Sequence, residues 1–142
     1  MKFIKASNQR EIFSVIYIRK DVFMDEQKVS VDEELDHRDI DADHYLLEVN
    51  DEFVGTCRVY YDDNDAIIGR VAVLKEHRNK GYAKYLMSKT IETLKDKDIN
   101  KVVLGAQVQA LNFYEKLGFK VCGKLYIDAN IEHYPMELIL WN

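Results

Sequence analysis

A short segment that starts at residue 78 combines residue types that can hold an anion. It follows a strand-like run and precedes a helix-like run. The first turn of a helix has unpaired N–H groups and a partial positive charge, so it attracts anions. Gly81 lets the backbone turn sharply and approach a ligand, while Arg78 and Lys80 add positive charge. These features predict a pyrophosphate site made of Arg78, Asn79, Lys80, Gly81, Tyr82 and Ala83.

The same segment also fits an ordinary loop between a strand and a helix, because one glycine is a weak signal. A Walker loop would need a Gly-Lys-Ser/Thr ending, and a dinucleotide fingerprint would need three spaced glycines. The segment has neither. The residues by themselves therefore leave both interpretations open.

Patterns of hydrophobic residues predict the elements that must position this segment. Short runs rich in β-branched residues indicate strands, and apolar residues at helical spacing indicate helices. Gly118 is well placed to end one helix in a left-handed conformation. We expect strands over 2–6, 44–50, 53–61, 66–74, 101–106, 119–123 and 134–140, and helices over 8–24, 82–97 and 108–117.

The order of these elements predicts an α/β fold of mixed α+β character. Strand 66–74, helix 82–97 and strand 101–106 form a β-α-β unit, which places two parallel strands side by side. The earlier strands are joined by short turns, as antiparallel neighbours are. We therefore expect a mixed, mostly antiparallel, twisted sheet with helices on both faces. Because no linker or repeat interrupts the pattern, residues 1–142 are predicted to form a single domain.

Composition narrows the class of protein. The chain has 142 residues, a net charge of −5 and a hydrophobic fraction of 47%. The acidic balance argues against a nucleic-acid binder. No apolar run reaches the roughly 20 residues of a membrane span, and no secretory signal is visible, so a cytoplasmic protein without membrane partners is expected. Cys57 and Cys122 lie in strand-like segments without metal-ligand spacing, which predicts buried free thiols and no metal site.

Two motifs together resemble those of the GNAT acetyltransferase superfamily. RNKGYA follows VAV, and LGAQVQALNFYEKLGF comes about 25 residues later. In that family an Arg/Gln-x-x-Gly-x-Gly/Ala segment wraps the pyrophosphate of acetyl-coenzyme A. The resemblance covers most of the chain and is strongest over 66–123. The segments VFMDEQKVSVDEELDHRD and EHYPMEL further resemble the small bacterial ElaA-like and YjcF-like branch.

The resemblance implies an N-acetyltransferase that moves the acetyl group of acetyl-CoA to a primary amine of a small molecule or peptide, by direct attack in a ternary complex. It implies that the main chain of Val71, Ala72 and Val73 pairs with the pantetheine arm. The amides of 78–83 would hold the pyrophosphate, with the Val73 N–H stabilising the developing oxyanion. Asn112 would bind near the pantetheine arm, and the Tyr114 hydroxyl would lie near the thioester sulfur. Tyr114 also fits a packing role and Asn112 a solvent-facing one.

The residue that deprotonates the amine is left open. A substrate ammonium with a pKa of about 10 must lose its proton before attack. Glu26 and His133 are the foremost candidates, with Glu34 and His44 behind them, and each also fits a structural or solvated role. We expect residues 25–43 to form an exposed loop or short irregular helix. Its acidic side chains either attract a cationic amine or are simply solvated: Asp32, Glu33, Glu34, Asp36, Asp39, Asp41 and Asp43.

Two further expectations concern partners. A non-catalytic acyl-CoA sensor or partner-binding module on the same fold is the competing function, because no base is evident. The C-terminal strand that ends at Leu140 and Trp141 is expected to be exposed, which would let it pair with a second copy and form a homodimer.

Overall fold

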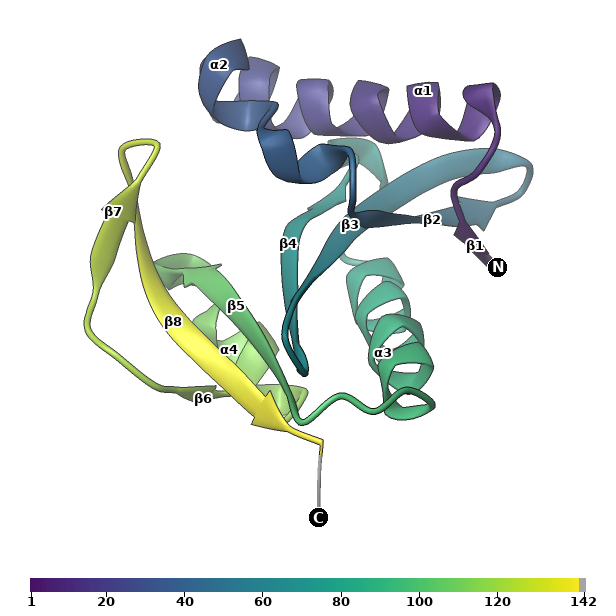
Figure 1. The fold of residues 1–142 in the computed structure, drawn as a ribbon. Coiled ribbons are helices and arrows are strands. Elements are labelled where there is room, and N and C mark those ends of the chain that lie inside the picture. The colour runs from purple at the N-terminus through teal and green to yellow at the C-terminus, as the bar shows by residue number, and fades with distance from the viewer. Residues whose placement is uncertain (141–142) are drawn as a thin grey trace.

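The structure, a computed structural model, describes residues 1–140. Within this range eight strands form one sheet in the order β1-β2-β3-β4-β5-β8-β6, with β7 paired to β8 (Figure 1). The strands are β1 (Lys2–Lys5), β2 (Asp43–Val49), β3 (Glu52–Asp62), β4 (Asp65–Val73), β5 (Lys101–Gln107), β6 (Lys120–Val121), β7 (Tyr126–Asp128) and β8 (Ile131–Ile139). The helices are α1 (Gln9–Arg19), η1 (Lys20–Glu26), α2 (Val31–Glu34), η2 (His37–Asp39), η3 (Lys75–His77), α3 (Tyr82–Lys95), η4 (Val108–Ala110) and α4 (Leu111–Lys116).

The expected fold class is confirmed. β4 and β5 pair in parallel, joined by α3, and every other pair described in the sheet is antiparallel. Helices lie on both faces, with α1 above and α3 below the sheet in the view of Figure 1. The expected helix over 8–24 continues past Arg19 as the wider π-helical turns of η1.

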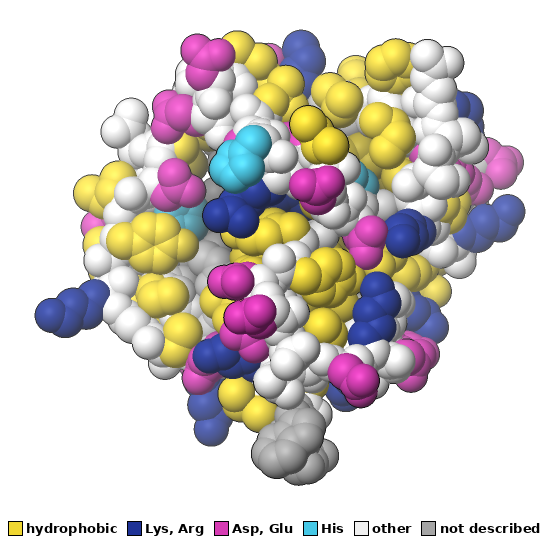
Figure 2. Space-filling view, viewed as in Figure 1, with side chains coloured by type: hydrophobic (Ala, Val, Ile, Leu, Met, Phe, Trp, Pro, Cys, Tyr) yellow, Lys and Arg dark blue, Asp and Glu magenta, His cyan; other side chains and the backbone are white. Residues whose placement is uncertain are grey.

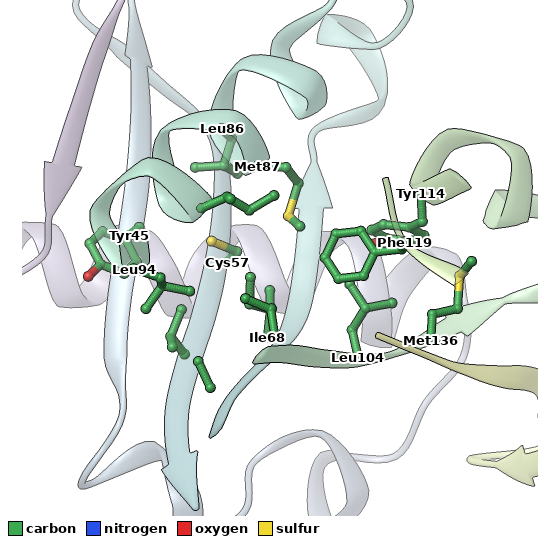
Figure 3. Packing of buried hydrophobic residues seen from close by; sticks show 14 of the residues in the cluster. Tyr45, Cys57, Ile68, Leu86, Met87, Leu94, Leu104, Tyr114, Phe119 and Met136 are labelled. Atoms are coloured by element: carbon green, nitrogen blue, oxygen red, sulfur yellow. The ribbon is translucent and has the colours of Figure 1, made fainter. Parts of the chain in front are cut away.

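Each face of the sheet has its own hydrophobic core, and β2 contributes to both. Leu47 packs with the α3 and α4 side, where Leu86, Met87 and Phe119 are buried (Figure 3). Leu46, the neighbouring residue, packs with the α1 side against Val15. The alternation of strand side chains between faces makes this division possible.

β4 and β5 separate along their length. They pair only from Asp65 to Ile68 on β4 and from Lys101 to Leu104 on β5. Just beyond the last pair, Arg70 has a φ of +52°, and the register between β3 and β4 shifts there, which marks a β-bulge. The bulge bends β4 away from β5, so the second half of β4 has no strand beside it on the β5 side.

Two expectations on exposure are wrong, and a third needs correction at one residue. Residues 25–43 are mostly exposed and include the short helices α2 and η2, as expected, but Glu34 is 1% exposed. Cys57 is buried as expected, but Cys122 is exposed because it follows the two-residue edge strand β6. The C-terminal strand is also not a free edge: β5 pairs along one side of β8, and β6 and β7 pair along the other. Leu140 is half-buried, and Trp141 lies outside the described residues.

The hairpin of β7 and β8 is an element that sequence patterns missed. Its two turn residues, Ala129 and Asn130, both have positive φ values. Such a turn is usually recognised by glycine or by Asn-Gly, and this sequence has neither at these positions.

Among residues 1–140 no helix combines the length and apolarity needed to cross a bilayer.

Candidate active site

A cavity of about 490 Å³ lies where β4 and β5 separate. η1 and α2 border it on one side and the β7–β8 hairpin on another. In Figure 2, acidic, basic, hydrophobic and histidine side chains lie together in the region of α2 and this hairpin. Its walls include Gly69, Arg70 and Val71 of β4, Leu104, Gly105 and Gln107 of β5, Tyr114 of α4, Tyr126, Ile131 and His133 of the hairpin, and Phe23, Gln27, Glu34 and Asp36 of the η1–α2 region.

The predicted pyrophosphate segment forms the turn into α3. Gly81 is the residue before the helix and has a φ of +82°, a conformation that favours glycine. The first N–H groups of a helix have no partner within the helix, and at this end no side chain caps them. A Cβ atom built on Gly81 would meet nothing within 4 Å, so open space lies against the backbone. Asn79 also has a positive φ, and Lys80 is exposed.

Arg78 does not point into this open space. Its Nε donates to the Val73 carbonyl at 2.9 Å, and its two Nη atoms contact the two carboxylate oxygens of Glu26 at 2.6 Å each. The hydrogen bonds from Arg78 lower the pKa of Glu26. Glu26 is also absent from the cavity wall. The structure therefore brings Glu26 to Arg78 of the segment 78–83 and not to the cavity wall.

The main chain of Val73 faces the gap beside β4. The Leu74 N–H donates to the carbonyl of Val54 in β3, so the N–H and the carbonyl of Leu74 face β3. Neighbouring residues of a strand point these groups to opposite sides. The Val73 carbonyl accordingly reaches Arg78 and not β3, and its N–H faces the same gap. Ala72 is buried and Val71 lines the cavity.

Tyr114 lies in the cavity wall and is 8% exposed. Its ring packs edge-on against Phe113 and Phe119, which fixes its position. Figure 3 shows Tyr114 beside Phe119. Burial raises the pKa of Tyr114 above its ordinary value, so the hydroxyl stays protonated at neutral pH. Both expected roles, packing and proton donor, fit this placement. Asn112, on the same helix, is exposed and does not line the cavity.

His133 lines the same cavity with one ring nitrogen fixed. Its Nδ1 lies 2.7 Å from the Ile131 carbonyl oxygen, which can only accept. Nδ1 therefore donates to this carbonyl, and Nε2 is the nitrogen with the lone pair in the neutral ring. The ring of Tyr126 stacks on the imidazole at 5.4 Å between centroids. Among the described residues, His133 is the histidine in the cavity wall; the Nε2 of His44 instead bonds to the Asp39 carbonyl.

A network of three arginines and three carboxylates borders the cavity, and sequence reasoning did not find it. Four of its members line the cavity: Arg58, Arg70, Glu34 and Asp36. Arg19 contacts Glu34 at 2.9 Å and Asp39 at 2.6 Å. Arg58 contacts Asp36 and Asp39, and Arg70 contacts Glu34 and Asp36. Burial alone would raise the pKa of Asp39, but the hydrogen bonds and charges of Arg19 and Arg58 lower it to about 2. The partners are 15 to 36 residues apart in sequence, so spacing gives no signal.

The comparisons with known proteins agree with this geometry. The family described as acetyltransferase (GNAT) domain matches residues 20–140. The chain therefore belongs to the GNAT acetyltransferase family, as its two motifs predicted. Within residues 1–140, no group of three or more His, Cys, Asp or Glu side chains is placed to hold a metal ion.

Individual relatives give a finer placement. The Bacillus subtilis protein named uncharacterized N-acetyltransferase YjcF is 32% identical over 137 residues, covering 96% of this chain and 98% of that protein. The crystal structure of Escherichia coli ElaA superposes with a TM-score of 0.85 at 29% identity, covering 96% of this chain and 97% of that one. The expected relation to the ElaA-like and YjcF-like branch is confirmed. An aminoglycoside 6′-N-acetyltransferase crystallised with coenzyme A shares the fold, with a TM-score of 0.79 at 13% identity over 100% of this chain and 98% of that one.

Proposed function

We propose that this chain is an acetyl-CoA-dependent N-acetyltransferase whose acceptor is a primary amine of a small molecule or peptide. One observation carries the proposal: the unpaired side of β4 leads from the open amino end of α3 to a cavity that contains both Tyr114 and His133. A cofactor held at one end would present its reactive group at the other.

The residues at the amino end of α3 fit a pyrophosphate. Gly81 leaves open space against the backbone, and unpaired N–H groups and the exposed Lys80 supply positive potential. The N–H of Val73 faces the gap along which the pantetheine arm would lie. Bound acetyl-CoA would supply an activated acetyl group as a thioester.

His133 and Tyr114 suit the two proton transfers. Nε2 of His133 would accept the proton that the amine loses as its nitrogen bonds to the acetyl carbon. The Tyr114 hydroxyl would donate a proton to the sulfur as the carbon–sulfur bond breaks, and the Val73 N–H would stabilise negative charge on the carbonyl oxygen. Burial raises the pKa of a phenol and of a thiol together, as it raises the pKa of Cys57 to about 12. A tyrosine thus remains a suitable donor to a thiolate in the same dry site.

The cavity volume limits the acceptor. About 490 Å³ is enough for a small molecule or the end of a peptide chain, which is the range of ordinary ligand sites. We also propose that the protein is cytoplasmic, where it would meet small molecules and peptides that have primary amines.

Turnover of acetyl-CoA with a panel of primary amines, followed by release of free thiol, tests the proposal. The decisive variant is Tyr114→Phe, which keeps the packing against Phe113 and Phe119. A catalyst should lose about 10-fold or more in kcat while still binding CoA in calorimetry, since only the proton donor is removed. If the wild-type protein binds CoA but releases no thiol with any amine, the chain is an acyl-CoA sensor instead.

A further inference from the structure

Two consecutive residues at the end of η1 reach to opposite sides of the gap between β4 and β5. Glu26 forms its two-pronged ion pair with Arg78, which follows β4. Gln27 accepts a hydrogen bond from the Nε2 of Gln107, the last residue of β5, at 3.0 Å. Gln107 in turn accepts one from Gln109. Neighbouring residues of a helix point in different directions, so one turn of η1 can contact both walls.

The contact with Arg78 extends to the strand itself. Arg78 donates from Nε to the Val73 carbonyl, and Val73 is the last residue of β4. Glu26 therefore fixes a guanidinium that is also attached to the end of β4 and lies three residues before Gly81. A two-pronged arginine–carboxylate pair holds both groups in one orientation, which a single contact cannot do.

The pairing also changes what Arg78 can do for an anion. Its charge is neutralised by Glu26, and its side chain is directed away from the turn into α3. The N–H groups of the turn and Lys80 are left to attract the pyrophosphate. The role of Arg78 is thus to shape the turn, and Glu26 holds Arg78 in the required position.

We propose that Glu26 and Gln27 form a strap across the gap, and that Glu26 is a positioning residue for acetyl-CoA rather than the base. The strap fixes the distance between the ends of β4 and β5, and so the width of the passage from the pyrophosphate turn to the cavity. Gln27 itself lines the cavity, so the same strap borders the acceptor. This inference rests on the proposed function, because it assigns acetyl-CoA to that passage.

The conformation of η1 suits a segment that places Glu26 and Gln27 on opposite sides of the gap. It is a π-helix, in which the Gln27 N–H donates to the Val22 carbonyl five residues back. π-helical turns are rare and are often found at functional sites. Lys28, the next residue, has a φ of +64°, so the chain leaves the helix directly after the strap.

The variant Glu26→Gln tests the strap, because it keeps the shape of the side chain and removes its charge. Glu26 and Arg78 are each about one-third exposed, so the protein should still fold. The control is Asp25→Asn, which removes a carboxylate from an exposed pair with Lys20 one position earlier. We expect Glu26→Gln to raise both the Kd for CoA and the KM for acetyl-CoA by roughly 10-fold with kcat changed less than about 3-fold, while Asp25→Asn leaves all three unchanged.

A second arm checks that the effect runs through Arg78. Arg78→Lys keeps the charge but cannot form the two-pronged pair, so it should resemble Glu26→Gln, and the double variant should be little worse than either one. Amide exchange over 78–83 should be faster in both single variants. This readout does not depend on activity.

The outcomes separate the strap from the function on which it rests. If wild-type protein gives no heat with CoA, the proposed function fails and the strap falls with it. If wild-type binds CoA and Glu26→Gln binds it equally well, only the strap is overturned. A loss of kcat with unchanged KM for acetyl-CoA would also overturn it, since that result would make Glu26 the base.

Discussion

At the scale of residues, the candidate site depends on a few side chains that are fixed before any ligand arrives. The proton on Nδ1 of His133 is set by the Ile131 carbonyl, and the plane of its ring is set by stacking on Tyr126. Tyr126 can lie this close to β5 because residue 105 is glycine: a Cβ atom there would overlap the Tyr126 hydroxyl. A glycine on one strand thereby determines how a histidine on the neighbouring strand is oriented.

The variant Gly105→Ala should displace Tyr126 and release the His133 ring. We expect kcat to fall by about 5- to 10-fold, because His133, the proposed base, would sample several orientations and would be less often in line with the amine. The fall is measured in the thiol-release assay at saturating acetyl-CoA.

Tyr126→Phe is the matched rescue. It keeps the ring stack and removes the oxygen that the new methyl group would meet, so the double variant should regain most of the lost kcat. Equal activity of Gly105→Ala and wild type would show that the stack has no role in catalysis.

At the scale of elements, the charged network joins helix α1 and the paired strands β3 and β4 to the segment from α2 to η2, which pairs with no strand. Arg19 comes from α1, Arg58 from β3 and Arg70 from β4, and all three bind carboxylates of the segment from α2 to η2. A buried charge without its partner is costly, so these elements hold together as one unit. The network also opposes the strain of the positive φ at Arg70 by giving its guanidinium several acceptors.

This network predicts how stability depends on pH. The pKa of Asp39 falls from an ordinary value of 3.8 to about 2 in the folded protein. A lowered pKa means that the ionised carboxylate stabilises the fold above about pH 4, and that this contribution disappears as the pH falls toward 2. Asp39→Asn should therefore lower the free energy of unfolding by about 2 kcal/mol at pH 7.

Urea unfolding of both proteins between pH 2 and pH 7 measures this effect. The two curves should approach each other at the acidic end, where Asp39 is about half protonated in the folded wild type and almost fully protonated in the unfolded chain. A constant difference across the whole range would mean that the substitution acts by packing and not by charge.

The same elements show how far the sequence leads. The sequence predicts a left-handed Gly118 at a helix end and a sharp turn at Gly81, and both glycines have positive φ values. The parallel pair of β4 and β5 followed from the β-α-β order. The hairpin at Ala129 and Asn130 was missed because neither residue signals its turn.

The burial of Glu34 was missed for a different reason. Local sequence describes what surrounds a residue along the chain, whereas the arginines that bury Glu34 belong to α1 and β4. The roles of Tyr114, His133 and Glu26 stay predictions, although the structure now separates them: the first two line one cavity, and Glu26 binds Arg78 outside it.

At the scale of the whole molecule, the central sheet divides two cores. Leu46 and Leu47 are fully buried neighbours on β2 that belong to different cores. Leu46→Ala and Leu47→Ala should each cost about 2–5 kcal/mol of unfolding free energy, as for other large-to-small changes in a core. Chemical denaturation followed by far-UV circular dichroism measures these free energies.

The exposed Phe13 of α1 provides the control for these two variants. It is 61% exposed, so Phe13→Ala should change the unfolding free energy by less than about 0.5 kcal/mol. A small effect at either leucine would mean that its core can collapse around the loss.

The brief pairing of β4 with β5 has a mechanical consequence. Four residue pairs link the two strands directly. Along the rest of the gap the strands are held by the core that they share with α3, to which Met87 and Leu104 both belong. A molecule bound in this gap would contact both strands and link them. The protein would then be more stable with the molecule bound than without it. A molecule that binds only the folded form raises the free energy of unfolding by its free energy of binding.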